Sequence, residues 1–125
     1  MDRRLFSDTS FDIEYLNDAY ADDAETAASV FVQYLEDLPK NQQQLSDSFR
    51  NRDITLFRQI IHKQKPGFSY VGLTDVTQKF QELQAACNTV EDLERCKEDI
   101  LTVMARIESS ATSIRQMLSH LQAYQ

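Results

Sequence analysis

Glycine and proline are both scarce in this sequence, with two of each among 125 residues. Because these residues supply most tight turns and interrupt helices, the chain has few places to turn and can form long elements. The residues that are plentiful, Gln, Glu, Leu, Ala and Lys, favour helix. The composition therefore predicts an all-α fold, and the length predicts one domain with its own core.

Positive charge and long apolar runs are also lacking. The net charge is −7 and the isoelectric point is near 4.7, whereas a nucleic-acid partner would require a clustered positive face that neutralises phosphates. The segment Met1–Ser10 contains charged groups but no apolar run, so we expect neither a signal peptide nor a membrane anchor. We therefore expect a cytoplasmic protein that binds neither nucleic acid nor membrane.

Cysteine and histidine are rare, with two residues of each type. Cys87 and Cys96 lack the spacing of paired metal ligands and lie on apolar stretches, so we expect reduced cysteines in the core. His120 should lie near the end of the last helix, where the helix dipole favours a cation. Together with His62 it cannot supply the three or four converging ligands of a metal site, so the sequence predicts no metal and no cofactor.

Apolar residues recur every three or four positions in four long segments, which is the period of a helix with one buried face. The first segment should begin at Asp22 or Asp23, whose carboxylates suit a helix N-terminus, and Pro39 should kink or interrupt it. Its apolar stripe comprises Ala27, Val30, Phe31, Tyr34, Leu35 and Leu38, continued by Leu45 and Phe49. A turn over Asn51–Asp53 should follow, with Asp53 as N-cap of the second segment.

Two further segments complete the pattern. Thr74 should cap the third, and Thr89 with Asp92 resembles a capping pair that opens the fourth. The third stripe comprises Val76, Phe80, Leu83 and Cys87, and the fourth comprises Leu93, Cys96, Ile100, Val103, Ile107, Ala111, Ile114, Leu118 and Leu121. A short leading helix from about Asp12 to Ala19, with Ile13 and Leu16 inward, should cover one end.

These segments predict an up-and-down antiparallel four-helix bundle with one or two short accessory helices. The bundle should extend over residues 11–125 as a single domain. We expect the preceding segment, residues 1–10, to be poorly structured.

His62 lies away from the apolar stripe of the second segment. At about 100° per residue, it projects roughly 120° from the centre of that stripe, so it should be exposed or at the edge of the core. The stripe is formed by Ile54, Phe57, Ile61 and Phe68, and the polar side shared with His62 by Thr55, Arg58, Gln59, Lys65 and Ser69. Lys63 projects about 100° away, so Lys65, with Arg58 on the other side, is the better neighbour of the imidazole.

An exposed imidazole between two cations can act as a nucleophile toward a phosphoryl group. Near pH 7 it is largely neutral and its lone pair can attack an activated phosphoryl group without a separate strong base. The resulting phosphohistidine adds negative charge, which Lys65 or Arg58 can stabilise through charge-assisted hydrogen bonds. The sequence contains no Gly-rich phosphate loop and no nucleotide motif, so we expect it neither to bind nor to hydrolyse ATP.

The stretch His62-Lys63-Gln64-Lys65, followed by Val71-Gly72-Leu73, resembles the signature of histidine-containing phosphotransfer (HPt) domains. In that family lysine follows the phosphoacceptor histidine at the third position and glycine at the tenth, which are Lys65 and Gly72 here. The order of segments is similar to the family from about Phe11 to about Cys87. The resemblance implies a phosphoryl carrier without kinase activity, which accepts a phosphoryl group on His62 from a receiver-domain aspartate and relays it in a multistep two-component phosphorelay.

The resemblance also implies partners. These are response-regulator receiver domains and a hybrid sensor histidine kinase, and the Mg²⁺ of the reaction belongs to the acidic pocket of the receiver. Lys65 would stabilise the phosphoryl group, and the docking face would comprise Arg58, Gln59, Lys63, Ser69 and Gly72. A structural role is sufficient to explain Gly72, because a positive φ at this position would let the chain reverse without strain. We expect the protein to act as a monomer.

Pro66 departs from the family pattern. Many members carry glycine at the fourth position after the histidine, where the absent side chain leaves room for the partner, whereas this chain has Pro66 there and Gly67 next. The proline removes the N–H that would bond the carbonyl of His62, so the helix should bend or loosen. Two alternatives stay open: a degenerate HPt-like adaptor that binds a signalling partner without phosphotransfer, and a bundle that only dimerises through its last helix.

Overall fold

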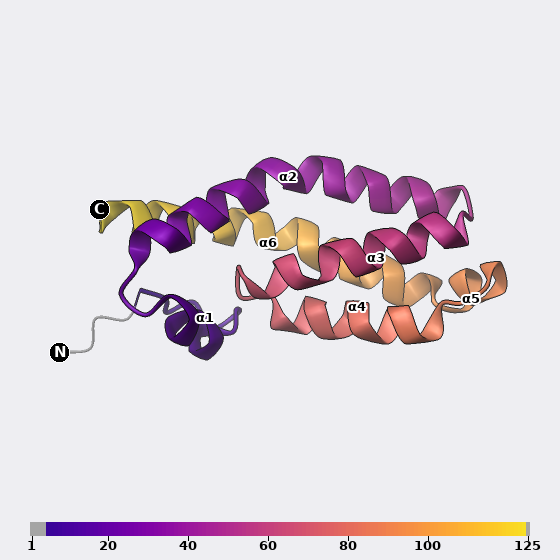
Figure 1. The fold of residues 1–125 in the computed structure, drawn as a ribbon, viewed down its shortest axis with the longest axis horizontal. Helices are drawn as coiled ribbons and strands as arrows, with labels where there is room; N and C mark the ends of the chain where they lie inside the picture. The colour runs from indigo at the N-terminus through magenta and orange to yellow at the C-terminus, as the bar shows by residue number, and fades with distance from the viewer. Residues whose placement is uncertain (1–4, 125) are drawn as a thin grey trace.

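The computed structural model describes residues 5–124, and every regular element among them is a helix. In chain order the helices are α1 (Ile13–Tyr20), α2 (Ala24–Arg50), α3 (Ile54–Ser69), α4 (Thr74–Ala86), α5 (Val90–Arg95) and α6 (Lys97–Ala123) (Figure 1). The all-α prediction is confirmed. Within the described range, no helix combines the length and the apolar character needed to cross a membrane.

Aspartate residues fix the start of the first three helices. The carboxylates of Asp12, Asp23 and Asp53 each accept a hydrogen bond from the backbone N–H three residues further on, at 3.0, 3.0 and 3.1 Å. Such caps satisfy N–H groups that a helix leaves unpaired, and each stabilises the fold by about 1 kcal/mol. The cap predicted at Asp53 is confirmed, and Asp23 rather than Asp22 caps α2.

Thr74 does not cap α4, contrary to the prediction. The N-cap is Leu73, which makes no side-chain cap hydrogen bond, and Thr74 is the first residue of the helix. The Thr74 hydroxyl instead donates to Oδ2 of Asp12 at 2.8 Å. This bond joins the start of α4 to the cap of α1, so the hydroxyl is used between helices and not within one.

The capping pair of Thr89 and Asp92 is confirmed, with each side chain bonded to the backbone N–H of the other residue. The helix that it opens is short, because α5 ends at Arg95 and α6 begins at Lys97. The fourth predicted segment is therefore two helices. Cys96 separates them, and its ψ of 6° lies well outside the helical value of about −42°.

Both prolines lie inside helices, Pro39 in α2 and Pro66 in α3, and neither ends its helix. Each lacks the N–H that would bond the carbonyl four residues earlier. α2 is therefore not interrupted at Pro39, and it curves along its length (Figure 1).

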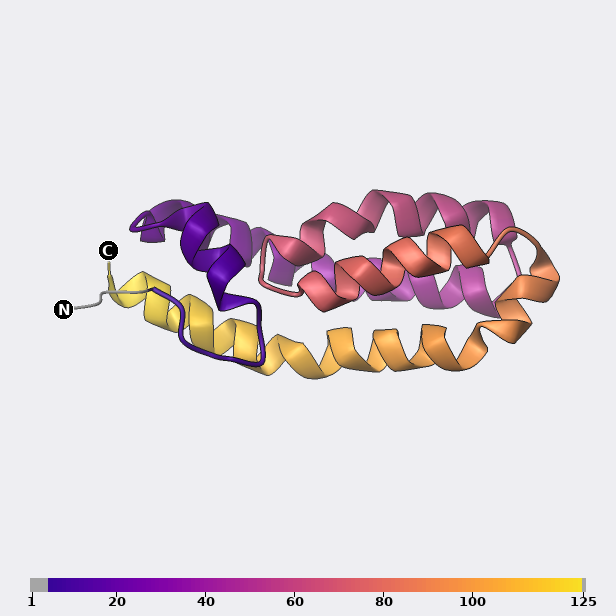
Figure 2. The ribbon, with the colours of Figure 1, turned by 90° about the horizontal axis from the view of Figure 1, so that it is seen from below.

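α2 and α6 run along the length of the molecule, α3 and α4 lie beside them over one half, and α1 lies beside the other half (Figure 1 and Figure 2). α2 and α4 each pack against both α3 and α6, so that one hydrophobic core lies between all four. Its largest fully buried side chains are Phe6, Phe31, Phe57, Phe80, Leu16, Leu45, Ile61, Leu73, Leu93, Ile100, Ile107 and Ile114. Several residues predicted for the core lie at its edge and are only partly buried, namely Ile13, Val30, Tyr34, Leu35, Ile54, Cys96 and Leu118. Burial of each large apolar side chain contributes about 1.5–3 kcal/mol, so the core is the main source of stability.

The segment before α1 is anchored at residues 5 and 6, which differs from the expectation of a poorly structured segment over residues 1–10. Leu5 and Phe6 are 4% and 2% exposed, and the Phe6 ring lies 5.9 Å from the rings of Tyr20 and Phe31. The Phe6 N–H also donates to Oδ1 of Asn17 at 3.3 Å. Aromatic burial therefore holds this part of the segment, while residues 1–4 and residue 125 lie outside the described residues.

Candidate functional site on the surface of helix α3

His62 is exposed on α3, as predicted, while its neighbour Ile61 is buried in the core. This placement follows from the phase of the helix, because Phe57, Ile61 and Phe68 face inward and direct His62 away from them. The imidazole is therefore accessible to a large partner.

A glutamine on α4 contacts the imidazole. Nε2 of Gln84 lies 3.3 Å from Nδ1 of His62, within hydrogen-bond distance. The other ring nitrogen, Nε2, has no hydrogen-bond partner among residues 5–124. Gln84 thus orients the ring from one side and leaves its second nitrogen open.

Lys65 contacts the same glutamine. Its Nζ donates to Oε1 of Gln84 at 3.0 Å and to Oε1 of Gln81 at 2.7 Å. Both acceptors are neutral amides, and no carboxylate pairs with Lys65 in the described part of the chain. The positive charge next to His62 is therefore not neutralised by a protein anion.

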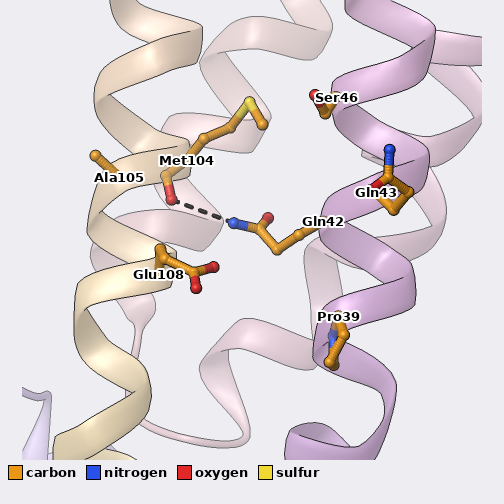
Figure 3. Close-up of a pocket in the computed structure, with 7 residues that line it drawn as sticks. All are labelled: Pro39, Gln42, Gln43, Ser46, Met104, Ala105 and Glu108. Carbon is orange, nitrogen blue, oxygen red and sulfur yellow. Dashed lines mark hydrogen bonds between the residues drawn. The ribbon is translucent and has the colours of Figure 1, made fainter.

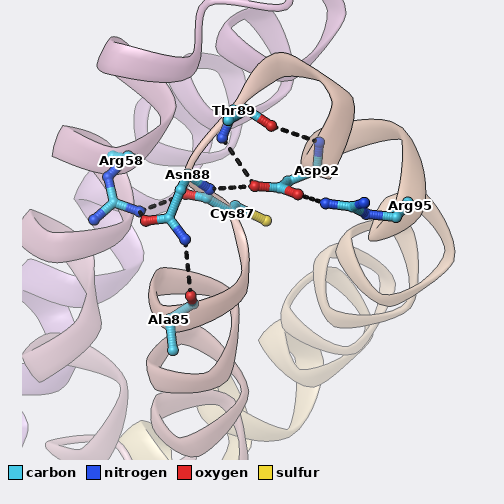
Figure 4. A network of polar contacts seen from close by, with 7 residues as sticks. All are labelled: Arg58, Ala85, Cys87, Asn88, Thr89, Asp92 and Arg95. Carbon is cyan, nitrogen blue, oxygen red and sulfur yellow. Dashed lines mark hydrogen bonds and ion pairs between the residues drawn. The ribbon is translucent and has the colours of Figure 1, made fainter.

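Arg58 has a different role from the one expected for a second cation beside the imidazole. Its Nη1 donates to Oδ1 of Asn88 at 2.9 Å and to the carbonyl of Cys87 (Figure 4). It also donates to the carbonyl of Gln84 at 2.9 Å. These acceptors lie at the C-terminal end of α4, where carbonyls lack intrahelical partners and a cation is favourable. Arg58 therefore ties α4 to α3 and does not face the imidazole.

Replacing Arg58 by Ala should lower the free energy of unfolding by about 1.5–3 kcal/mol, because three acceptors lose a charged donor. Urea unfolding followed by circular dichroism measures this. Arg50→Ala is the matched control, because Arg50 is exposed and its one ion pair among residues 5–124 is with Asp47, one helical turn earlier. Its loss should cost less than about 0.5 kcal/mol. Equal effects of the two substitutions would show that Arg58 does not support the end of α4.

The other residues predicted for the docking face lie on two sides of α3. The Ser69 hydroxyl is 2.8 Å from that of Thr77, which also donates to the carbonyl of Lys65 at 3.2 Å, so Ser69 faces α4. Gln59 and Lys63 face the opposite side of α3. Both line a hollow of about 350 Å³ between α2 and α3, and Lys63 also lines a second hollow of about 460 Å³ between the same two helices. The residues predicted for one docking face therefore lie on opposite sides of α3, Ser69 toward α4 and Gln59 and Lys63 toward α2.

Gly72 is buried between α3 and α4 with a φ of +84°, the positive value that the sequence predicted. A Cβ at this position would lie 2.6 Å from Cδ1 of Leu16 and 3.1 Å from Cβ of Phe11. The Gly72 carbonyl accepts a bond from the Asp12 N–H at 2.9 Å. Because Gly72 has no side chain, the start of α1 can pack directly against the turn that follows α3.

Gly67 lies within α3, one position after Pro66, and an added Cβ would meet nothing within 4 Å. It lines the larger hollow between α2 and α3 together with the half-exposed Tyr70. The open space at Gly67 therefore lies on the α2 side of α3, whereas His62 contacts α4, and Pro66 is exposed next to Gly67.

A further hollow of about 480 Å³ lies between α2 and α6 and is lined in part by Pro39, Met104 and Glu108 (Figure 3). Nε2 of Gln42 donates across it to the carbonyl of Met104 at 3.2 Å. It contains none of the residues predicted for function. Within residues 5–124 no group of three or more His, Cys, Asp and Glu side chains is arranged to hold a metal ion.

Gln81 and Gln84 are the site residues that the sequence analysis missed. They are three positions apart on α4, and a helical projection would place them on one polar face. The projection alone cannot say that this face meets His62, because that depends on how α4 packs against α3.

Comparison of the chain with models of protein families, with characterised proteins and with solved structures returned no match.

Proposed function

We propose that this protein is a histidine phosphotransfer carrier whose four long helices form an HPt-like up-and-down antiparallel bundle. It accepts a phosphoryl group on His62 from a receiver-domain aspartate and passes it reversibly to another receiver. The observation that supports this most directly is an exposed imidazole oriented through Nδ1 by Gln84, beside a lysine that no carboxylate neutralises. The resemblance of His62, Lys65 and Gly72 to the HPt signature supports the same function.

In the proposed reaction this chain supplies a nucleophile, His62, and a positive charge, Lys65. Nε2 of His62 attacks the phosphorus of an aspartyl phosphate, the bond from phosphorus to the aspartate oxygen breaks, and the aspartate leaves as a carboxylate. Mg²⁺ belongs to the partner's acidic pocket. Lys65 stabilises the charge on the transferred group. The chain is a carrier and not an ATP-dependent kinase.

Lys65 also determines which ring nitrogen is free in the proposed reaction. Its ammonium can only donate, so it holds Oε1 of Gln84 and turns the amide NH₂ toward Nδ1 of His62. In this state the neutral ring carries its proton on Nε2. When Lys65 turns to an incoming phosphoryl group, the Gln84 amide is released and rotates. The exposed ring then loses its Nε2 proton to solvent and takes up a proton from solvent at Nδ1, whose N–H donates to Oε1 of Gln84, and the lone pair of Nε2 is available for attack.

The test is incubation of the purified chain with a panel of phosphorylated receiver domains, followed by intact-mass measurement at neutral or alkaline pH, where phosphohistidine survives. The expected result is a mass gain of one phosphoryl group that disappears after acid treatment. Absence of any gain with a receiver that binds the chain would overturn the carrier function.

Replacing Lys65 by Ala should slow transfer by about 10-fold to 100-fold, because a charge-assisted hydrogen bond to a phosphoryl group contributes about 1.5–3 kcal/mol. Rapid-quench kinetics with a phosphorylated receiver measure the rate. Lys79→Ala is the matched control, since it removes the same charge from α4 at a side chain paired with Glu82 at 3.3 Å. An unchanged rate in Lys65→Ala would remove Lys65 from the site.

The alternative is an HPt-like adaptor that binds a signalling protein without chemistry, in the cytoplasm and as a monomer like the carrier. Pro66, exposed one turn from His62, and the hollow beside Lys63 and Tyr70 favour this alternative. A receiver would then bind the wild-type chain and the His62→Gln variant equally well, and neither would gain a phosphoryl group. Titration calorimetry on both proteins, run beside the mass measurement, separates the two functions.

A further inference from the structure

Lys65 is held at rest by two glutamines of α4. Its Nζ lies 2.7 Å from Oε1 of Gln81 and 3.0 Å from Oε1 of Gln84. An ammonium group has three N–H donors, so these two hydrogen bonds leave one donor for a further acceptor. The resting ammonium is therefore restrained by α4 and still has a donor for an oxygen atom of a partner.

The two glutamines differ in what else they contact. The Gln84 side chain also reaches Nδ1 of His62, and its backbone carbonyl accepts a bond from Arg58. Gln81 is exposed, and the bond to Lys65 is the only hydrogen bond that its side chain makes within residues 5–124. Any effect of the Gln81 amide on the site should therefore pass through Lys65.

We propose that Gln81 is a positioning residue, which holds Lys65 beside His62 while the lysine exchanges Gln84 for an oxygen of the phosphoryl group. This role rests on the function proposed above, in which Lys65 turns from Gln84 to the transferred group. Because its third donor is free, the ammonium can bind a phosphoryl oxygen before it leaves Gln84, and it need not leave Gln81 at all.

A lysine without this anchor would contribute less to the reaction. Its stem is flexible and its ammonium is strongly hydrated, so ordering the side chain at the moment of transfer opposes the reaction. With the bond to Gln81 in place, much of that ordering is already complete in the resting chain. Gln81 therefore speeds transfer without touching the phosphoryl group.

A neutral amide suits this position better than a carboxylate does. Gln81 binds the ammonium through an uncharged oxygen, so Lys65 keeps its full charge for the phosphoryl group. A carboxylate at the same place would pair with Lys65 and repel the negative phosphoryl group. The adjacent Glu82 pairs with Lys79 at 3.3 Å, so its carboxylate is directed to another lysine.

The first experiment tests the anchor in the unphosphorylated chain. Carbon relaxation NMR of the Lys65 ε-methylene, assigned with the Lys65→Ala variant, gives the order parameter of this group. The order parameter should fall in Gln81→Ala, because one of the two bonds that restrain the ammonium is lost. An unchanged order parameter would overturn the anchor, whatever the transfer experiment shows.

Gln78→Ala is the matched control for this measurement and for the next. Gln78 is exposed on the same helix, three positions before Gln81, and no hydrogen bond of its side chain is found within residues 5–124. This variant should keep both the order parameter of Lys65 and the transfer rate of the wild type. Equal losses in Gln78→Ala and Gln81→Ala would overturn a specific role of Gln81.

The second experiment tests the role in transfer. Rapid-quench kinetics over a range of concentrations of a phosphorylated receiver separate the maximal rate from the half-saturating concentration. Gln81→Ala should lower the maximal rate by about 3-fold to 10-fold, which corresponds to the ordering cost of one long side chain, and leave the half-saturating concentration unchanged. A maximal rate equal to that of the wild type would overturn the role in transfer.

Combination with Lys65→Ala separates positioning from a general structural effect. If Gln81 acts through Lys65, the double variant should transfer as slowly as Lys65→Ala alone. A further loss of about 3-fold or more in the double variant would overturn the proposal, because Gln81 would then act independently of Lys65. If a receiver binds the wild-type chain without labelling it, the carrier function fails and the role in transfer fails with it, while the order parameter still decides whether Gln81 anchors Lys65.

Discussion

Replacing His62 by Gln should abolish phosphoryl labelling completely while leaving the fold intact. Glutamine has no nucleophilic nitrogen, so no covalent intermediate can form. His62 is exposed and its hydrogen bond to Gln84 is long at 3.3 Å, so the free energy of unfolding should change by less than about 0.5 kcal/mol. Intact mass after incubation with a phosphorylated receiver, and urea unfolding of the same sample, measure the two effects.

The chain supplies a matched control for this substitution in its other histidine. His120→Gln removes an imidazole that is also exposed but packs edge-on against Tyr124 at 5.1 Å between ring centroids. This variant should keep the full mass gain. Labelling that persists in His62→Gln, or that is lost equally in both variants, would contradict His62 as the phosphoacceptor.

The caps and the helical phases could be predicted because they depend on local sequence. Asp53 caps the helix directly after it, and the alternation of Phe57, Ile61 and Phe68 fixes which way His62 points. Both follow from the geometry of a single helix, for which three or four residues make one turn. The identity and exposure of the candidate nucleophile were therefore accessible without a structure.

The surroundings of His62 could not be predicted in the same way, because they depend on how α3 and α4 pack. Gln84 reaches the imidazole and Arg58 turns to the end of α4, and both placements depend on the rotation of one helix against the other. Arg58 shares the polar side of α3 with His62 in projection, yet open carbonyls at the end of α4 compete for its guanidinium. The break at Cys96 is likewise a tertiary feature, since the apolar stripe continues through it.

Replacing Gly72 by Ala should lower the free energy of unfolding by about 2–5 kcal/mol, because the added methyl group strains the backbone and overpacks the core. A φ of +84° costs an alanine about 1–2 kcal/mol. The new Cβ would also lie 2.6 Å from Leu16, which is fully buried and cannot move away freely, and such overpacking costs about 1–3 kcal/mol. Urea unfolding measures the sum.

Gly67→Ala is the control for the same chemical change in an open setting. Gly67 is helical, and its added Cβ meets nothing within 4 Å, so the helix gains about 0.5–1 kcal/mol. The two substitutions should therefore shift stability in opposite directions. Equal shifts would show that Gly72 is not held between Leu16 and Phe11, and that α1 is not seated on the turn that follows the His62 helix. Opposite shifts would show that the fold requires a glycine at position 72 and does not require one at position 67.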